Sequence, residues 1–255
     1  MSARGSLRIV GLGPAGEAWL TPEASDFIAN ASDLVGYGPY LQRVPCKDGQ
    51  MRHESRNREE IDRARHALQL AEAGRRAVIV SGGDPGVFGM AAAVFEAIET
   101  GKPEWREIDV AVSPGITAMQ AVAARAGAPL GHDFCAMSLS HNLKPWAVIE
   151  KRLAAAAAAD FVIALYNPAS AARGEGIFKA LALLRSLKPA DTPVVFARAA
   201  GRKEEEILIE TLAATDPARA DMSTLIIIGS SETRVIARDT GTPFVYTPRT
   251  ARISR

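Results

Sequence analysis

The segment 78–90, VIVSGGDPGVFGM, contains the residues best suited to bind a ligand. Its apolar run, Val78 to Val80, is typical of a buried parallel strand and ends at the glycine-rich loop 81–86. Glycines let backbone N–H and C=O groups approach a ligand closely, because no Cβ is present. The loop lacks the Gly-Lys-Ser/Thr ending of a P-loop and has one carboxylate, Asp84. It therefore suits a ligand with hydroxyl groups or a cation better than a polyphosphate, and the alternative is a turn that binds nothing.

A second loop, Ser113 to Ala118, also follows an apolar run. The sequence after Pro114 has a helical pattern through Arg125. The N-terminus of a helix presents unpaired N–H groups and the positive end of the helix dipole, which suit a carboxylate or another polar head group. Because neighbouring parallel strands end at the same edge of a sheet, the two loops are expected to converge on one ligand. The alternative is an ordinary connection between a strand and a helix that binds no ligand.

The first loop, residues 11–16 (GLGPAG), matches the G-x-G-x-x-G pattern of a dinucleotide site. In that motif the helix opens within the glycine loop and faces a pyrophosphate. Here the helix signals come later, with Thr21 as N-cap and Pro22 at the first helical position. The acidic residue expected at the end of the second strand is also missing, since that strand ends with residues 35–37, VGY. The sequence therefore disfavours NAD binding.

Three further polar features are candidates for ligand contact or proton transfer. Asn167, in the segment LYNP, either caps the turn that follows or reads the edge of an adenine. His141 lies in the polar stretch 138–142, SLSHN, and histidine is the usual proton carrier near neutral pH. The basic stretch 51–58, MRHESRNR, is either a solvated loop and helix start or a segment that binds a ligand with several carboxylates. The four histidines lack metal-ligand spacing, so no metal site is predicted.

The composition narrows the class of protein. The chain has 255 residues with 47% hydrophobic content, enough for one large domain or two of ordinary size. Its 30 basic and 29 acidic residues leave a net charge of +1, and this balance does not indicate binding to nucleic acid. Cys46 and Cys135 have no His or Cys companions and fit a reducing cytoplasm. We expect neither a signal peptide nor a membrane span, because no stretch of about 20 uncharged apolar residues occurs.

Strand-like and helix-like runs alternate in the first half, which predicts an α/β fold with a mostly parallel sheet and helices on both faces. A helix is expected over Glu59–Ala73, with Asn57 as its candidate cap and Gly74 as its stop. The expected strands are 7–12, 34–37, 77–80 and 110–112.

The second half predicts a mixed sheet, because only two long helices, 145–158 and 174–187, separate its strands. The short polar connection between 194–197 and 207–212 indicates a hairpin. The segment AGAPLG concentrates Gly and Pro, so the expected domains are 1–128 and 129–240, with an irregular tail over 241–255. The strands expected in this half are 134–138, 161–166, 194–197, 207–212 and 225–228.

Taken together, six stretches of the chain resemble the tetrapyrrole methyltransferases, which use S-adenosylmethionine (SAM). The stretches are, in order, VGLGPAGEAWLTPEA, VGYGPYL, SGGDPGVFG, SPGITAMQA, LYNP and DMSTLIIIG, and they span about residues 7–235. Within this family the chain is most similar to the enzymes that methylate C-17 of precorrin-3B, notably in SGGDPGVFGMA and SLSHNLKPWAVIEKRL. It departs from them at His141, where an aspartate is expected, and this departure bears on any acid/base role of that position.

The resemblance implies two αβα domains, an active site in the cleft between them, a homodimer, and SAM bound between the domains. SAM has a carboxylate, an ammonium group, ribose hydroxyls, an adenine and no phosphate, which suits backbone loops with one acid and no lysine. Carried over position by position, the resemblance implies cofactor contacts at Pro14, Gly82, Gly83, Asp84, Val87, Thr117, Ala118, Tyr166, Asn167, Ala199 and Thr224.

The implied reaction is methylation of the tetrapyrrole precorrin-3B at C-17 with ring contraction to precorrin-4, in cobalamin biosynthesis in the cytoplasm. Positioning of the ring carbon in line with the methyl group contributes up to about 7–11 kcal/mol in favourable cases. Ring contraction also moves protons, so a general acid or base is expected, and His141 is the candidate. Asp84 is the second predicted catalytic residue, through a charge-assisted hydrogen bond. The candidate partners of the substrate's carboxylate arms are the basic residues Arg52, Arg56, Lys144, Arg198 and Arg202.

Three alternatives stay open. The first is another corrin-pathway methyltransferase, including the version of this step that acts on a cobalt-containing macrocycle. The second is a NAD-dependent oxidoreductase with its site at residues 11–16. The third is a binding module that retains the fold without catalysis.

Overall fold

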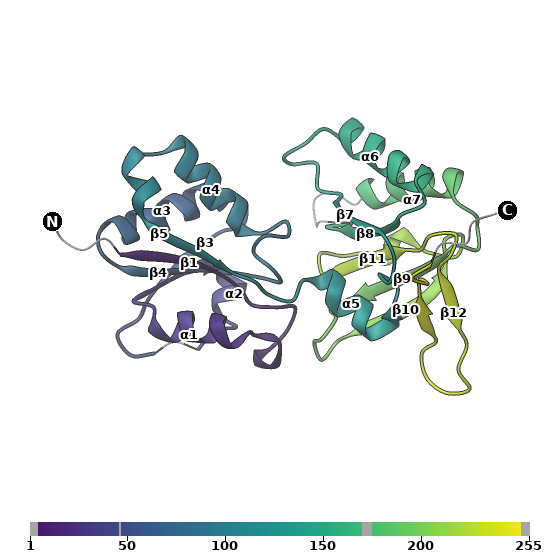
Figure 1. Cartoon of the computed structure of the whole chain (residues 1–255), viewed down its shortest axis with the longest axis horizontal. Helices are drawn as coiled ribbons and strands as arrows, with labels where there is room; N and C mark the ends of the chain where they lie inside the picture. The colour runs from purple at the N-terminus through teal and green to yellow at the C-terminus, as the bar shows by residue number, and fades with distance from the viewer. Residues whose placement is uncertain (1–4, 46, 170–174, 251–255) are drawn as a thin grey trace. The chain divides into compact units, whose positions relative to one another are not determined.

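The computed structural model describes residues 5–45, 47–169 and 175–250 (Figure 1). Cys46 and Gly174, which entered the predictions above, lie outside these residues. The chain divides into two compact units, Met1–Thr117 and Ala118–Arg255. The α/β fold class is confirmed, since one unit has a parallel sheet and the other a mixed sheet.

The first unit is built on a five-stranded sheet of spatial order β3-β2-β4-β1-β5, in which every neighbouring pair is parallel. Apolar runs form its central strands because both faces of the sheet are covered. The strands are β1 (Ser6–Gly11), β2 (Asp33–Tyr37), β3 (Met51–Ser55), β4 (Arg76–Ser81) and β5 (Asp109–Ser113).

Helices cover both faces of this sheet (Figure 1). Side chains alternate along β4, so that Ile79 packs in the core on one face and Val80 in the core on the other. The Ile79 face is covered by α3 (Glu60–Glu72) and α4 (Met90–Thr100), and the Val80 face by α1 (Pro22–Asn30) and α2 (Gly38–Leu41). Two 3₁₀ turns, Glu17–Trp19 and Pro103–Glu107, complete this unit.

Local sequence signals set the start of α1 and the end of α3. The hydroxyl of Thr21 accepts a hydrogen bond from the backbone N–H of Ala24 at 3.1 Å, which confirms the predicted N-cap of α1. Gly74, with a φ of +83°, follows the end of α3 as predicted. The predicted cap Asn57 is wrong, because Glu59 occupies the N-cap position of α3.

The basic stretch 51–58 is not only a loop and a helix start, since Met51–Ser55 form the edge strand β3. This strand pairs with β2 along its whole length. The pairing satisfies backbone N–H and C=O groups of β2 that would otherwise lie exposed at the edge. This pairing depends on the assembled sheet, so the polar composition of residues 51–55 does not predict the strand.

The second unit has a mixed five-stranded sheet of order β10-β9-β11-β8-β7, in which only β7 and β8 are parallel among the described pairs. The predicted hairpin is confirmed by the antiparallel pairing of β9 with β10. The strands are β7 (Phe134–Ser138), β8 (Val162–Tyr166), β9 (Pro193–Arg198), β10 (Glu206–Thr211) and β11 (Thr224–Ile228).

Two long helices, α6 (Trp146–Ala158) and α7 (Glu175–Leu187), lie together over one face of this sheet (Figure 1). Ile163, Phe196 and Ile226 point toward them and form the largest core cluster of this unit. Helix α5 (Ala118–Ala126) packs against β9, β10 and β11. A 3₁₀ turn, Pro217–Arg219, precedes β11.

The packing of α5 explains why the boundary between the units differs from the expected one. The units divide between Thr117 and Ala118 and not after residue 128, because α5 is part of the second unit. The segment from residue 241 onward is also not uniformly irregular. Strand β13 (Phe244–Tyr246) pairs with β12 (Arg234–Ile236) and with the short β6 (Gly127–Ala128). None of the helices in the described part of the chain has the length and apolar character needed to cross a bilayer.

Candidate functional site

Three glycine-containing loops meet at the carboxyl edge of the first unit's sheet, the edge where β1, β4 and β5 end. The N–H of Gly13 donates to the carbonyl of Gly83 at 3.1 Å, and the N–H of Gly83 donates back to Gly13 at 3.0 Å. Gly13 and Gly83 have φ values of +63° and +66°, in the left-handed region that favours glycine. The loops after β1 and β4 are therefore fixed by backbone pairing between two residues that have no Cβ.

The third loop approaches so closely that a side chain would not fit. A Cβ built on Gly115 would lie 2.3 Å from the carbonyl oxygen of Gly83 and 2.8 Å from Cα of Gly11. The glycine at 115 is therefore required by contact with the protein's own backbone.

Asp84 ties two of these loops together. Its Oδ1 accepts a hydrogen bond from the N–H of Gly86 at 2.7 Å, and its Oδ2 accepts one from the N–H of Gly115 at 3.0 Å. The loops 81–86 and 113–118 are thus joined, and that they converge on one ligand stays a prediction. A carboxylate has about four acceptor positions, so these two contacts leave capacity for a ligand.

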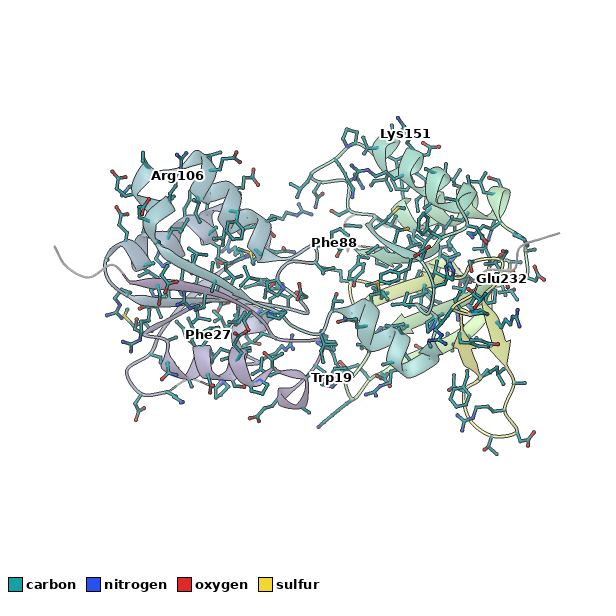
Figure 2. The ribbon with its side chains drawn as sticks, in the orientation of Figure 1. Trp19, Phe27, Phe88, Arg106, Lys151 and Glu232 are labelled. Atoms are coloured by element: carbon teal, nitrogen blue, oxygen red, sulfur yellow. The ribbon has the colours of Figure 1, made fainter. Side chains whose placement is uncertain are left out.

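The other predicted cofactor residues of the first unit lie around the same edge. Gly82 faces Tyr40, since a Cβ built on Gly82 would lie 2.6 Å from Cζ of that ring. Pro14 follows Gly13, and the N–H of Val87 donates to the carbonyl of Asp84 at 3.4 Å. The loop continues to Phe88 (labelled in Figure 2), an exposed aromatic residue with a φ of +54°.

The helix signals that argued against a dinucleotide site are also confirmed. After the loop 11–16 the chain forms the short 3₁₀ turn at residues 17–19, and α1 begins only at Pro22. No α-helix N-terminus therefore opens inside this loop.

In the second unit, β7, β8 and β9 end at the edge where β10 and β11 begin. Two residues predicted to contact the cofactor lie there, Tyr166 as the last residue of β8 and Asn167 directly after it. Asn167 has a φ of +52°, and its Nδ2 donates to the hydroxyl of Ser138 at 2.9 Å. The hydroxyl of Tyr166 accepts a hydrogen bond from the N–H of Met119 at 3.1 Å, in the first turn of α5. Asn167 therefore joins the ends of β8 and β7, and Tyr166 joins β8 to α5.

Ala199 and Thr224 lie on the neighbouring strands of the same edge. Ala199 follows β9 with a φ of +51°, and its N–H donates to the carbonyl of Ser223 at 3.0 Å. The hydroxyl of Thr224 donates to Asp221 at 2.8 Å. Burial raises the pKa of the Asp221 carboxyl, but hydrogen bonds from Thr224, Arg198 and the N–H of Ser223 outweigh it and lower this pKa overall.

The boundary between the two units separates two neighbouring residues that are both predicted to contact the cofactor. Thr117 is buried at the end of the first unit, and Ala118 begins α5 in the second. The predicted cofactor residues thus fall on both units. That they bind one ligand stays a prediction.

The candidate partners of the substrate's carboxylates differ in their present contacts. Arg52 donates to the carbonyl of Leu41 at 2.9 Å and to that of Val44, and Arg198 pairs with Asp221 at 2.7 Å. These contacts hold the protein's own segments together and compete with a substrate role for both arginines.

The other candidates differ from one another in how far they are exposed to solvent. Arg56 and Arg202 are exposed residues, and Lys144 and His141 lie half-buried on the loop between β7 and α6. Burial, reinforced by the nearby charge of Arg152, lowers the pKa of Lys144. Substrate contact by these four residues stays a prediction.

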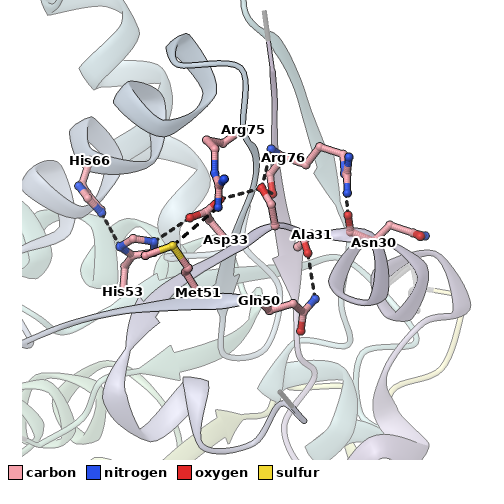
Figure 3. A network of polar contacts seen from close by, with 10 residues as sticks. Asn30, Ala31, Asp33, Gln50, Met51, His53, His66, Arg75 and Arg76 are labelled. Carbon is pink, nitrogen blue, oxygen red and sulfur yellow. Dashed lines mark hydrogen bonds and ion pairs between the residues drawn. The ribbon is translucent and has the colours of Figure 1, made fainter. Parts of the chain in front are cut away.

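A polar network around the buried Asp33, near the amino end of β2, was not predicted from the sequence (Figure 3). Asp33, fully buried, accepts from Arg75 Nε at 2.7 Å and Ser32 Oγ at 2.7 Å, and lies 2.9 Å from Nε2 of His53. Nδ1 of His53 lies 2.9 Å from Nε2 of His66 on α3.

These contacts shift two pKa values. Burial raises the pKa of Asp33, but hydrogen bonds from Arg75, Ser32 and His53 outweigh it and lower this pKa overall. Burial is the main cause that lowers the pKa of His66, and the charge of His53 lowers it further. No sequence signal links these residues, because they come from separate elements. Among the described residues, no group of three or more His, Cys, Asp or Glu side chains is arranged to hold a metal ion.

The fold and the loop geometry agree with what comparison with known proteins finds. Residues 6–216 match the family described as Tetrapyrrole (Corrin/Porphyrin) Methylases. The chain belongs to this family. It is 56% identical over 245 residues to the precorrin-3B C(17)-methyltransferase of a Sinorhizobium species, covering 96% of both chains.

Other relatives extend the same picture. The chain is 47% identical over 249 residues to the cobalamin biosynthesis protein CobIJ of Mycobacterium bovis, of which it covers 48%. It superposes on the crystal structure of the methyltransferase CobJ with a TM-score of 0.90 at 47% identity, covering 96% of this chain and 100% of that one. A uroporphyrin-III C-methyl transferase from Thermus thermophilus, solved with S-adenyl homocysteine, shares the fold at a TM-score of 0.63 and 20% identity, over 88% and 92% of the two chains.

Proposed function

We propose that this protein transfers the methyl group of SAM to C-17 of precorrin-3B and promotes contraction of the macrocycle to precorrin-4, as a step of cobalamin biosynthesis. The observation that carries the proposal is the 56% identity, over 96% of both chains, to a relative named for methylation of precorrin-3B at C-17. The backbone-lined carboxyl edge of the first unit supports it, because its chemistry fits the proposed methyl donor.

The residues present fit SAM in type. The loops offer backbone N–H and C=O groups at glycines, one carboxylate at Asp84, and no lysine within 81–86 or 113–118. Asn167, which follows β8 with a φ of +52°, carries an amide that could read an adenine. Such a set suits ribose hydroxyls, an ammonium group and an adenine, and lacks the cation that a polyphosphate needs.

When bound, SAM supplies a methyl group on a positively charged sulfur, which is already strongly electrophilic. The work left to the protein is to hold donor and macrocycle in line, which contributes up to about 7–11 kcal/mol in favourable cases. The rigid pairing of Gly13 with Gly83 and the anchoring of Gly115 by Asp84 suit that task. Asp84 is the one charged side chain among these loops, and it is proposed to orient the bound donor.

Ring contraction also requires proton movement, for which His141 is the proposed acid or base. The imidazole would hold or deliver a proton at one of its ring nitrogens. We expect His141→Ala to lose the contracted product while S-adenosylhomocysteine (SAH) still binds. Normal product formation by this variant would move the search to His53 and to the hydroxyls of Ser138 and Ser140.

The acetate and propionate arms of the substrate need cationic partners, and the proposed ones are Arg52, Arg56, Lys144, Arg198 and Arg202. We further propose that the enzyme acts in the cytoplasm as a homodimer. Light scattering is then expected to give twice the 27.1 kDa mass of one chain, and a 27.1 kDa particle would contradict the dimer.

A second candidate is the same step on a cobalt-containing macrocycle. It is favoured by 41% identity over 230 residues to a probable cobalt-factor III C(17)-methyltransferase of Salmonella typhimurium. The lower identity places this candidate second. The ratio of turnover rates on metal-free and cobalt-loaded substrate separates the two.

The deciding experiment incubates the protein with precorrin-3B and SAM and follows the mass and absorbance of the product together with SAH release. The expected product is one methyl group heavier and has the changed spectrum of a contracted ring. Titration calorimetry with SAH and with NAD gives the control. Tight NAD binding without a SAH signal would overturn the proposal.

A further inference from the structure

Arg43 lies just beyond α2 and contacts the loop that follows β1. Its Nη2 donates to the carbonyl oxygens of Leu12 and Gly13, each at 2.9 Å, and to the carbonyl of Ala15. One cationic group thus holds three carbonyls within the stretch 12–15. Hydrogen bonds from a charged donor are stronger than those between neutral groups, so this contact restrains the loop firmly.

The direction of these carbonyls also sets the direction of N–H groups in the loop. The peptide bond is planar and trans, so a carbonyl turned toward Arg43 turns the N–H of the next residue the opposite way. After Leu12, that N–H belongs to Gly13 and donates to Gly83 at 3.1 Å. After Ala15, it belongs to Gly16, an exposed residue on which a built Cβ has no heavy atom within 4 Å. Arg43 therefore orients one N–H for pairing between the loops and another at an open position.

The segment that carries Arg43 also supports the second loop. The ring of Tyr40 lies against Gly82, where a built Cβ would be 2.6 Å from the ring's Cζ. The N–H of Arg43 donates to the carbonyl of Tyr40 at 3.1 Å. Arg52 in turn holds the carbonyls of Leu41, at 2.9 Å, and Val44. The segment 38–44 is thus anchored on β3 and touches two of the three loops that the proposed cofactor would use.

We propose that Arg43 is a positioning residue for the methyl donor, which sets the geometry of the loop 12–15 and, through Gly13, of the loop 81–86. The inference rests on the proposed function, because it assumes that these loops bind SAM. Removal of the guanidinium leaves three carbonyls without their charged donor and frees the loop to rotate its peptide planes. The expected consequence is weaker donor binding with the fold retained.

The test is the affinity of the intact protein for SAH, measured by titration calorimetry. Arg43→Met keeps the apolar stem and removes the donors, and we expect its Kd to rise at least tenfold. Arg43→Lys restores a cation with three N–H donors for three carbonyls, and we expect its Kd to stay within about threefold of wild type. Arg185→Met is the matched control, since Arg185 holds the carbonyls of Leu212, at 3.0 Å, and Thr215 in the second unit. This control is expected to lose thermal stability and keep its SAH affinity.

The outcomes separate the possible failures. Wild-type SAH affinity in a folded Arg43→Met variant would overturn the positioning role. If that variant does not fold, Arg43→Gln, which keeps one amide donor, decides the matter: a raised Kd supports the role and an unchanged Kd overturns it. Equal weakening in Arg43→Lys and Arg43→Met would also overturn it, because the donors would not matter. Failure of the wild-type protein itself to bind SAH would instead contradict the proposed function.

Discussion

The two edges of the first unit's sheet differ in how they satisfy their polar groups. At the carboxyl edge, backbone binds backbone through Gly13 and Gly83, and the single carboxylate of Asp84 accepts only backbone N–H groups. Near the amino edge, the carboxylate of Asp33 is surrounded by Arg75, Ser32 and His53. A buried charge whose partners are all side chains of the same protein has its acceptor positions filled by that protein, and removing one of those partners is strongly destabilising. The paired loops, held from one side by Arg43, keep backbone groups and the carboxylate of Asp84 with capacity for a ligand, which is why the proposed site lies at the carboxyl edge.

The largest effect that separates the two edges is expected from Gly83→Val. A β-branched residue is strongly disfavoured at a φ of +66°, and relief of that strain would disturb the backbone pairing of Gly83 with Gly13 that fixes the two loops. We expect SAH affinity to fall on the order of 100-fold or more, and backbone strain to cost roughly 1–3 kcal/mol of stability. Titration calorimetry and urea unfolding measure the two effects.

Gly49→Val is the matched control for that variant. Gly49 also has a positive φ, +81°, but a Cβ built there meets nothing within 4 Å. It should show the strain without the loss of SAH binding. Unchanged SAH affinity in Gly83→Val would make the loop purely structural.

A smaller effect is expected from Asp84→Asn. An amide offers one acceptor oxygen, so its NH₂ group would face either the N–H of Gly86 or that of Gly115. Loss of a hydrogen bond to a charged group costs about 1.5–3 kcal/mol, which corresponds to roughly 10- to 100-fold in SAH affinity.

Asp216→Asn makes the same change of a carboxylate to an amide in a turn of the second unit, where Asp216 accepts from the N–H of Ala218 at 2.9 Å. It should leave SAH binding unchanged. Equal SAH affinity in Asp84→Asn and the wild type would remove Asp84 from the proposed site.

These residues also show what sequence can predict and where it fails. The loop 81–86 and the cap at Thr21 were predictable, because a strand run followed by glycines, and a Thr-Pro-Glu start, act on their own neighbours. The contacts of Arg43 with loop 12–15 and of Asp33 with His53 join elements that only the assembled sheet brings together. Strand β3 belongs to the same class, since its pairing with β2 and not its polar composition makes it a strand.

The smallest effect is expected from pH, and it concerns the amino edge. The folded-state pKa of His66 is lowered, so the folded protein binds fewer protons at this site than the unfolded chain does. Its contribution to stability is therefore present above the ordinary histidine pKa of about 6.5 and is lost as the pH falls below it. The lowered pKa of Asp33 adds a second loss, with the same sign, as the pH falls further through the carboxylate range.

Urea unfolding of wild type and His66→Gln between pH 7.5 and 5.5 checks this prediction. The variant should lose less stability than the wild type over that interval, because it lacks the titrating ring. SAH affinity should not follow the titration of His66, which lies away from the carboxyl edge. Identical pH dependence in the two proteins would contradict the role given to His66.

Hydrogen–deuterium exchange of the intact protein with and without saturating SAH tests most directly whether the carboxyl edge is the donor site. We predict slower exchange in the backbone of residues 11–16, 81–89 and 113–118, and no change in residues 51–66, which contain His53 and His66. Protection confined to residues 51–66, or no protection in the three loops under conditions where SAH is bound, would contradict it.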